Sequence, residues 1–321
     1  KKIVITEAIN HHEKFVQKNK RNLKYSVTHG DPNDYNIVVK NHKIVGLIDF
    51  GDSIYAPSIN DLAIALAYAL MKSQNLFDTL HNIISSYNKI NPIRDDEIYS
   101  LLGLVKSRLA ITLVMAAKQR KKYPDNKYLS ISEKNAWDLI FKLNKIDPYF
   151  FIAVIRSICN KEPISNFSQR LKLLKSQQFG NIFDFDLNEV NKKIVHFDKK
   201  STLLQSNPSN TKLNKLVEKF LNNGVGVGLY KEKRKVYKSN HYISSLNSAE
   251  RRDIHLGIDI FVDQNTIVRS PLNGKVKILH NNDFKYDYGP TVILEHKINN
   301  YIFYTLYGHL SEKCLKKLKV G

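Results

Sequence analysis

The sequence predicts an α+β protein of two domains, because its apolar residues follow different periods in different parts of the chain. Two β-branched runs between residues 37 and 48 surround a polar turn, which is typical of a hairpin. From Asn60 onward apolar residues recur at helical spacing, and after residue 216 strand-like runs return. The 321 residues are enough for about two domains of roughly 100–200 residues each.

The first predicted domain covers residues 1–160 and consists of a small hairpin followed by a helical block. Residues 1–24 are Lys-rich with scattered apolar positions, which favours a helix, and residues 25–28 predict a short strand. The hairpin strands are Ile37–Val39 and Ile44–Ile48. Helices are then expected from residue 60 and near residues 75–90, 95–120, 132–146 and 148–159, with a capping box at residues 130–133.

The remainder divides into a polar segment and a β domain. Residues 161–215 are rich in Ser, Gln, Asn and Lys and are expected to form a linker or bridging segment. Residues 216–321 are expected to form a mostly antiparallel β domain. Gly224–Gly228 lacks the third glycine of a dinucleotide loop, so a Gly-rich turn is expected there. The predicted strands are 266–268, 274–279, 291–295 and 301–307, with a hairpin turn at 299–300.

Cysteine content and hydropathy restrict the class of protein. Cys159 and Cys314 cannot make a disulfide framework or a four-thiolate zinc site, so a reducing, cytoplasmic setting is expected. The first residues are charged and do not resemble a signal peptide. The most apolar run, residues 101–117, contains Lys106 and Arg108, so no membrane partner is expected.

The net charge of +20 arises from 50 Lys and Arg against 30 Asp and Glu. These basic residues are spread along the chain, without a helix-turn-helix, zinc-finger or aromatic RNA-binding pattern. The expectation is therefore a solvated Lys-rich surface that attracts anionic substrates such as nucleotides, and no nucleic-acid partner. A structural or nucleic-acid-binding protein is one alternative to the two enzyme functions considered below, and tight, salt-sensitive DNA binding would favour it.

The densest chemical signal is His29-Gly30-Asp31-x-x-x-x-Asn36, followed after the hairpin by Ile48-Asp49-Phe50-Gly51-Asp52. Phosphoryl transfer from a nucleotide needs one carboxylate to orient the attacking hydroxyl, and oxygen ligands to hold Mg²⁺ across the phosphates. An Asp-Phe-Gly alone is usually a turn, and a His-Gly-Asp alone is usually a loop. The two together, between strand runs and before an apolar helix, are much rarer.

This pattern resembles the aminoglycoside phosphotransferase superfamily, the small-molecule relatives of protein kinases. The segments 61–65, 104–117 and 124–129 look most like hydroxylysine kinases. The resemblance implies a protein-kinase-like C-terminal lobe that phosphorylates a hydroxyl of a small amine or amino acid. By this resemblance Asp31 is the catalytic base, and Asn36 and Asp49 are ligands of the Mg²⁺ that accompanies ATP or GTP. Asp52 and Arg108 are expected near the substrate. His29 is expected to support the loop, and Asp61 to anchor the start of the next helix.

A kinase of this type also has a β-rich lobe with a Gly-rich flap and a phosphate-binding Lys. Only 28 residues precede His29, and they contain no such flap. The expectation is a fragment of a longer multidomain enzyme that is inactive by itself. A catalytically silent scaffold is the alternative.

A second group of candidate residues lies in His255-Leu256-Gly257-Ile258-Asp259. If this segment enters a strand, the side chains of His255 and Asp259 project to the same face, where a histidine nitrogen and a carboxylate oxygen could bind zinc. With the motifs at 270–276, 288–296 and 304–311, it resembles lysostaphin-type zinc endopeptidases over residues 250–321. The resemblance implies His255 and Asp259 as Zn²⁺ ligands and His309 as a catalytic histidine. The family's third ligand lies in a later His-x-His, so a truncated domain with weak or no zinc binding is expected here. A zinc metallopeptidase with a kinase-like scaffold is the alternative function.

The order of the two domains resembles multidomain proteins in which both precede a class III aminotransferase. Residues 227–230 and 250–255 also resemble the joining region of those fusions. Pyridoxal phosphate is therefore expected only if an aminotransferase domain follows in the parent chain. The oligomeric state and the choice between ATP and GTP are left open.

Overall fold

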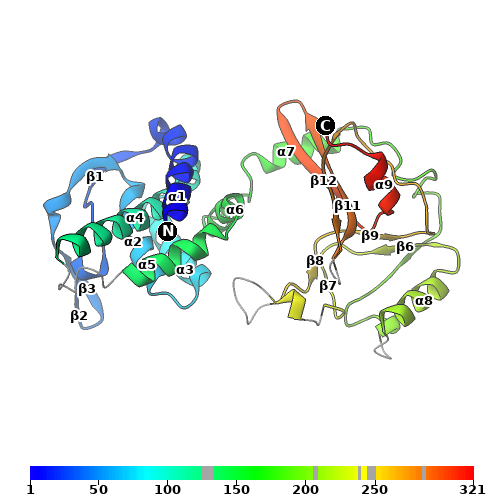
Figure 1. Cartoon of the computed structure of the whole chain (residues 1–321), viewed down its shortest axis with the longest axis horizontal. Coiled ribbons are helices and arrows are strands. Elements are labelled where there is room, and N and C mark those ends of the chain that lie inside the picture. Colours follow the sequence, from blue (N-terminus) through cyan, green and yellow to red (C-terminus); the bar gives the residue numbers. More distant parts are fainter. Residues whose placement is uncertain (124–132, 205–208, 238–239, 244–250, 284–286) are drawn as a thin grey trace. The chain divides into compact units, whose positions relative to one another are not determined.

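The computed structural model describes residues 1–123, 133–204, 209–237, 240–243, 251–283 and 287–321 (Figure 1). They form two compact units, Lys1–Ser168 and Gln169–Gly321. The α+β fold class is confirmed: helices dominate the first unit, and the second is rich in mostly antiparallel strands. The predicted capping box falls mainly outside the described residues, as do residues 124–129 of the kinase resemblance and Glu250 of the joining region.

Two small antiparallel sheets lie at one end of the first unit (Figure 1). Strand β2 (Ile37–Lys40) pairs with β3 (Lys43–Leu47), which confirms the predicted hairpin. Its turn residues, Asn41 and His42, both have positive φ, as a tight type I′ turn requires. Strand β1 (Tyr25–Thr28) was predicted, whereas its partner β4 (Ile54–Pro57) was not. The loops that contain the phosphotransfer motif connect these four strands.

Helices form the rest of the first unit, in the predicted places. Asn75 caps one of them by accepting hydrogen bonds from two backbone N–H groups, and Asp147 followed by Pro148 starts another in the same way. The helices are α1 (Lys2–Phe15), α2 (Ile59–Met71), α3 (Leu76–Ile90), α4 (Asp95–Lys122), α5 (Glu133–Asn144) and α6 (Pro148–Ile158).

Helix α4 is the centre of this unit and packs against α1, α2 and α5. Within the described part of the chain it is the one helix long and apolar enough to cross a bilayer. Its apolar face, however, is buried in the protein core, and Leu101, Val105 and Leu109 are fully buried there. Burial of such a side chain contributes roughly 1.5–3 kcal/mol, so core packing accounts for the apolar composition of α4.

The second unit contains a three-stranded antiparallel sheet of β10 (Lys275–Asn282), β11 (Gly289–Ile298) and β12 (Tyr301–Tyr307). These strands confirm three of the four predicted ones, and Asn299 in the β11–β12 turn has positive φ. The fourth prediction was wrong. Residues 266–268 are irregular, because Thr266 closes a turn by donating its backbone N–H to Asp263. Helix α9 (Glu312–Lys317) packs beside β10 and β11.

A second sheet joins β5 (Lys192–Ile194), β6 (Val225–Gly228) and β9 (Asp259–Phe261), with β5 and β6 parallel. The turn expected at Gly224–Gly228 was wrong, because 225–228 form β6. Residues 161–215 contain α7 (Phe167–Lys175), β5 and the first half of α8 (Asn210–Leu221), and the structure places residues 192–204 within the second unit. Val195 and Phe197 pack there against Val217 and Leu221 of α8.

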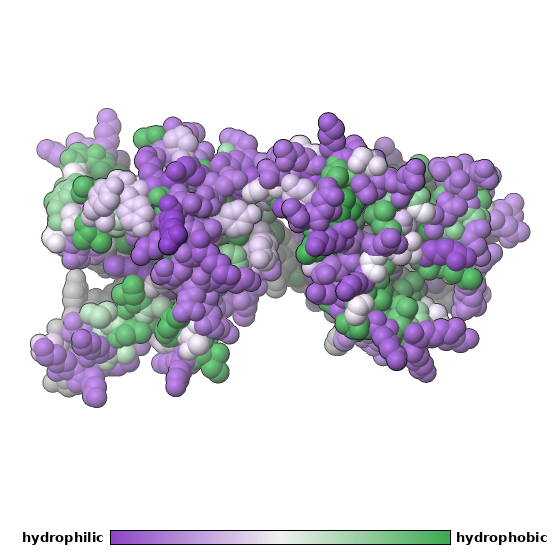
Figure 2. Space-filling model, turned by 90° about the horizontal axis from the view of Figure 1, so that it is seen from above, coloured by the Kyte–Doolittle hydropathy of each residue, from purple (hydrophilic) through white to green (hydrophobic). Residues whose placement is uncertain are grey.

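Two short strands complete the second unit and lead to its candidate site. Strand β7 (Glu232–Lys233) pairs antiparallel with β8 (Ile254–His255), and Glu232 lies opposite His255. The face of the molecule in Figure 2 is mostly hydrophilic, with small hydrophobic patches over both units. Such a surface agrees with a composition in which Lys and Arg exceed Asp and Glu by 20.

Candidate functional site

Helix α2 holds the loop that contains the first motif. The carboxylate of Asp61, in the first turn of α2, accepts hydrogen bonds from the backbone N–H groups of His29 (2.8 Å) and Gly30 (3.0 Å). An acidic residue is favourable at a helix N-terminus, so this carboxylate serves both the helix and the loop. Asp61 thereby fixes the backbone that leads into Asp31.

His29 and Asn36 join this loop to the second motif. The Nε2–H of His29 donates to the carbonyl of Ile48 (2.9 Å), while its Nδ1 accepts from the backbone N–H of Asp31 (3.3 Å). The backbone N–H of Ile48 donates to the carbonyl of Asn36 (2.9 Å). Both backbone groups of Ile48 are therefore fixed, and Asp49 is the next residue along the chain.

A glycine allows the two motifs to approach each other closely, and the second motif contains an aspartate with a strained backbone. Gly30 has φ +87°, and a Cβ at this position would lie 2.3 Å from the carbonyl oxygen of Asp52, so only glycine allows this approach. Asp49 adopts the left-handed conformation, with φ 65° and ψ 62°. This conformation costs a non-glycine residue about 1–3 kcal/mol and is concentrated at functional sites.

The carboxylate of Asp31 is held from two sides. Its Oδ1 pairs with the Arg108 guanidinium of α4 at 2.5 Å, and its Oδ2 accepts from the Asn33 side chain at 2.8 Å. Arg108 also donates to the hydroxyl of Tyr68 in α2 at 2.9 Å. The Asp31 and Arg108 side chains are 22% and 23% exposed, so the carboxylate is oriented and yet accessible to a small molecule.

The chemistry of Asn36 and Asp49 fits a magnesium ion. The buried Asn36 donates its Nδ2–H to the carbonyl of Asp31 (2.9 Å), which leaves Oδ1 as its possible ligand atom. Asp49 is exposed and offers a carboxylate. Mg²⁺ prefers such oxygen ligands and needs only one or two from protein besides phosphate and water. Asp52, also exposed, lies against Gly30.

Sequence reasoning named Arg108 but missed two of the residues that hold this site. Asn33 lies inside the first motif, so its position was available as a signal. Tyr68 lies on the helix that follows the motif, and only the packing of α2 against α4 brings it to Arg108.

The second group of candidate residues lies where β8 ends and β9 begins. Nε2 of His255 is 3.5 Å from Oδ1 of Asp259, so the two side chains face each other. The other oxygen of Asp259 forms an ion pair with Arg234 at 2.6 Å. Sequence reasoning missed Arg234, which bonds Glu232 (3.1 Å) and the hydroxyl of Tyr237 (3.2 Å) as well. Burial alone would lower the pKa of Arg234, but Asp259 and Tyr237 outweigh it and raise that pKa.

These residues fit zinc only in part. The separation of His255 and Asp259 suits two ligands of one cation, but a catalytic zinc needs a third. Among the residues that the structure describes, no further His, Cys, Asp or Glu completes a three-ligand group with them. His309 has φ 55°, donates its backbone N–H to Tyr288 (2.6 Å) and lies beside that ring. No hydrogen bond or ion pair among the described residues joins it to His255 or Asp259.

Comparison with known families finds one match within each unit. Residues 3–80 match the phosphotransferase enzyme family, and this stretch contains Asp31, Asn36 and Asp49. Residues 253–320 match peptidase family M23, and this stretch contains His255, Asp259 and His309. A phosphotransferase segment and an M23, lysostaphin-type segment thus follow each other in one chain, as predicted. The joining to an aminotransferase stays a prediction.

Several relatives share the kinase part. The chain is 35% identical to hydroxylysine kinase of Mus musculus over 121 residues, which cover 35% of this chain and 32% of the relative. It is 30% identical to that of Xenopus laevis over 145 residues, covering 42% and 39%, and 29% identical to that of Bos taurus over 121 residues, covering 35% and 32%. The chain therefore spans about a third of the length of these curated relatives. No solved structure matches the chain.

Proposed function

We propose that the first unit is the catalytic-loop lobe of a small-molecule kinase, which transfers the γ-phosphate of ATP or GTP to a hydroxyl of a small amine or amino acid. The observation that carries this proposal is the Asp31 carboxylate, which Arg108 and Asn33 orient, on a loop that hydrogen bonds join to Asn36 and to Ile48 next to Asp49. The phosphotransferase match supports the reaction class. The relatives' name, hydroxylysine kinase, supports a hydroxylated amino acid as acceptor.

Each residue has a role in the proposed reaction. The substrate hydroxyl donates a hydrogen bond to Asp31, its oxygen attacks the γ-phosphorus, and the nucleoside diphosphate leaves as its bond to that phosphorus breaks. Asp31 takes the proton of the hydroxyl as the new P–O bond forms. Asn36 and Asp49 would hold Mg²⁺, which when bound neutralises charge on the phosphate oxygens. Asp52 and Arg108 are proposed to line the acceptor pocket.

The proposal includes a nucleotide-binding lobe that would cover the hairpin. The hairpin and the second motif leave Val39, Ile44 and Phe50 exposed by 59%, 73% and 60%, an apolar surface beside the proposed metal site. Such surfaces mark contacts with other protein parts or ligands. Activity is therefore proposed for the protein in which this lobe is present.

The test is phosphorylation of hydroxylysine, ethanolamine and homoserine by the full-length protein and its Asp31→Asn variant. Loss of a general base lowers turnover by about 10²–10⁴-fold, while nucleotide binding is expected to remain. Asp34→Asn is the matched control, because Asp34 lies on the same loop but pairs with the exposed Lys72. Normal turnover of Asp31→Asn would refute the role of this residue and the proposal with it.

A zinc-dependent peptidase with a kinase-like scaffold is the second candidate function. The M23 match and the facing His255 and Asp259 favour it. The lack of a third ligand among the described residues opposes it, and the ion pair with Arg234 leaves only Oδ1 of Asp259 for a metal. Stoichiometric zinc in the full-length protein that is lost in His255→Ala, together with peptide hydrolysis, would decide for this candidate.

A further inference from the structure

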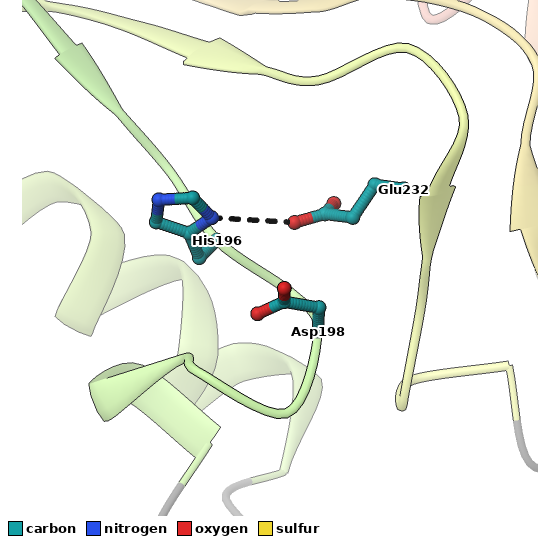
Figure 3. Close-up of side chains that lie close together, drawn as sticks. All are labelled: His196, Asp198 and Glu232. Atoms are coloured by element: carbon teal, nitrogen blue, oxygen red, sulfur yellow. Dashed lines mark ion pairs between the residues drawn. The ribbon is translucent and has the colours of Figure 1, made fainter.

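A cluster of three potential metal ligands lies in the second unit outside both matched families. His196 and Asp198 are two residues apart just after β5, and both side chains lie near Glu232 in Figure 3. Glu232 faces them from β7 (Figure 3). One ligand atom from each residue lies within 4.8 Å of the others. Ligand atoms around one zinc ion lie about 2 Å from the metal and so roughly 3–3.5 Å from one another, and these three side chains would close on a cation to reach that separation.

The imidazole of His196 provides an observation independent of the clustering. Its Nδ1 is shielded from solvent and has no hydrogen-bond partner, and the nearest acid oxygen is Oε1 of Glu232 at 3.7 Å (Figure 3). This distance is too long for a hydrogen bond. A solvent-shielded ring nitrogen without a partner is costly, and it points at the two carboxylates. A cation between these groups would satisfy Nδ1.

Hydrogen bonds already orient the two carboxylates. Oε1 of the buried Glu232 accepts from the backbone N–H of Phe197 (2.9 Å), and Oε2 accepts from Arg234 (3.1 Å). Oδ1 of Asp198 accepts from the backbone N–H of Lys200 (2.8 Å). Ligating carboxylates in metal sites are commonly fixed by such outer hydrogen bonds, while a lone pair of each group remains for the metal.

We propose that His196, Asp198 and Glu232 form a binding site for a first-row divalent cation, with Zn²⁺ as the best match. One imidazole nitrogen with two carboxylate oxygens is a ligand set that zinc accepts, and water completes the coordination. Asp198 offsets part of the charge of the cation, and Glu232 shares its charge between the cation and Arg234. The site ties the segment after β5 to β7, so its role is structural. It shares no ligand with His255 and Asp259 and does not depend on the kinase proposal.

The test is titration of the 321-residue chain with Co²⁺, followed by visible absorption, and with Zn²⁺, followed by calorimetry and by thermal unfolding. His196→Ala and Asp198→Asn are the test variants. The histidine ring is 40% exposed, and asparagine keeps an acceptor for the Lys200 N–H, so both variants should fold. Each is expected to weaken binding by at least about tenfold and to remove the zinc-dependent rise in the unfolding temperature.

Two further variants separate this site from other histidines. His280→Ala replaces an exposed histidine of β10, and it should bind as the wild type does. His255→Ala removes the M23-type pair and should leave binding at His196 unchanged. Wild-type binding by both His196→Ala and Asp198→Asn would overturn the proposal. So would loss of binding in His255→Ala alone, or an unaltered wild-type chain that binds neither metal saturably.

Discussion

Both units contain a candidate functional aspartate paired with an arginine, and the two pairs differ in their surroundings. Asp31 and Arg108 are 2.5 Å apart and similarly exposed, at 22% and 23%. Asp259 and Arg234 are 2.6 Å apart, but the Arg234 side chain is only 6% exposed. Arg234 also lies over the Phe197 ring and bonds Glu232, whereas Arg108 bonds the hydroxyl of Tyr68.

The difference separates an orienting contact from a structural one. A partly accessible ion pair can exchange partners with a substrate, because water or ligand groups replace the lost contact at little cost. A buried arginine with two carboxylate partners cannot leave without stranding their charges. We infer that Arg108 positions Asp31 for chemistry, and that Arg234 stabilises the second unit beside Asp259, the residue proposed from the M23 resemblance as a zinc ligand.

The largest expected effect is therefore that of Arg234→Met. It leaves the buried Glu232 and the partly buried Asp259 without their cation, and we expect the second unit to lose about 3–5 kcal/mol of stability. Hydrogen exchange of β6 and β9 measures this loss. The single tryptophan, Trp137, lies in the first unit, so its fluorescence transition should stay unchanged.

The neighbouring Lys233→Met is the matched control for this prediction. Lys233 is 75% exposed and pairs with Asp253 at the surface, so its removal should change stability by about 0–1 kcal/mol. Equal effects of the two substitutions would show that the burial of Arg234 does not matter, and the contrast between the two arginines would fail.

The second expected effect is on turnover. Arg108→Met removes one of the two contacts that orient Asp31, worth about 1.5–3 kcal/mol for a charged hydrogen bond, so kcat should fall roughly 10–100-fold. The fall in kcat should be similar for hydroxylysine and ethanolamine, because Asp31 is oriented in the same way for both, whereas a contact of Arg108 with the acceptor would change KM differently for the two. Arg108→Lys should recover part of the loss, since a cation remains beside Asp31. Unchanged kcat in both variants would contradict the orienting role.

Much of the fold could be predicted, because local patterns decide it. The positions Leu62, Leu66 and Leu70 recur at helical spacing and are buried in α2. Gly224–Gly228 was misread, because glycines usually weaken a strand. In β6 they are needed: a Cβ on Gly226 would lie 2.9 Å from both Leu221 and Val195. That requirement comes from the packing of α8, which the strand's own sequence does not contain.

In the candidate sites, too, local sequence indicates some residues, and only the packing of distant segments brings in the others. Asp31, Asn36 and Asp49 come from one continuous stretch of chain, and the pattern of that stretch indicated all three. The residues that orient or pair with the candidates come from elsewhere. Tyr68 and Arg108 meet through the packing of two helices, and Arg234 reaches Asp259 from a different loop. His196 and Asp198 had a signal in their spacing of two, but the third member, Glu232, needs the fold.

The smallest expected effect concerns a buried cation that, unlike Arg234, has no carboxylate partner among the described residues. Lys106 of α4 is 5% exposed, and among the described residues it forms no ion pair. Burial lowers its pKa to about 8, and the charge of Glu7 offsets only part of this. Lys106→Met should therefore stabilise the first unit, by about 1–3 kcal/mol at neutral pH. Arg234→Met should do the reverse in the second unit.

The pH dependence gives the sign of this effect. The unfolded chain binds a proton on Lys106 below the ordinary lysine pKa of 10.5, and the folded chain binds it only below about 8. Between these values the unfolded state holds more protons, so stability rises with pH across this window. Lys106→Met should remove that rise, measured by Trp137 fluorescence in denaturant, and Lys118→Met, on the exposed face of α4, should keep it. Destabilisation by Lys106→Met would mean that its charge is compensated within the core.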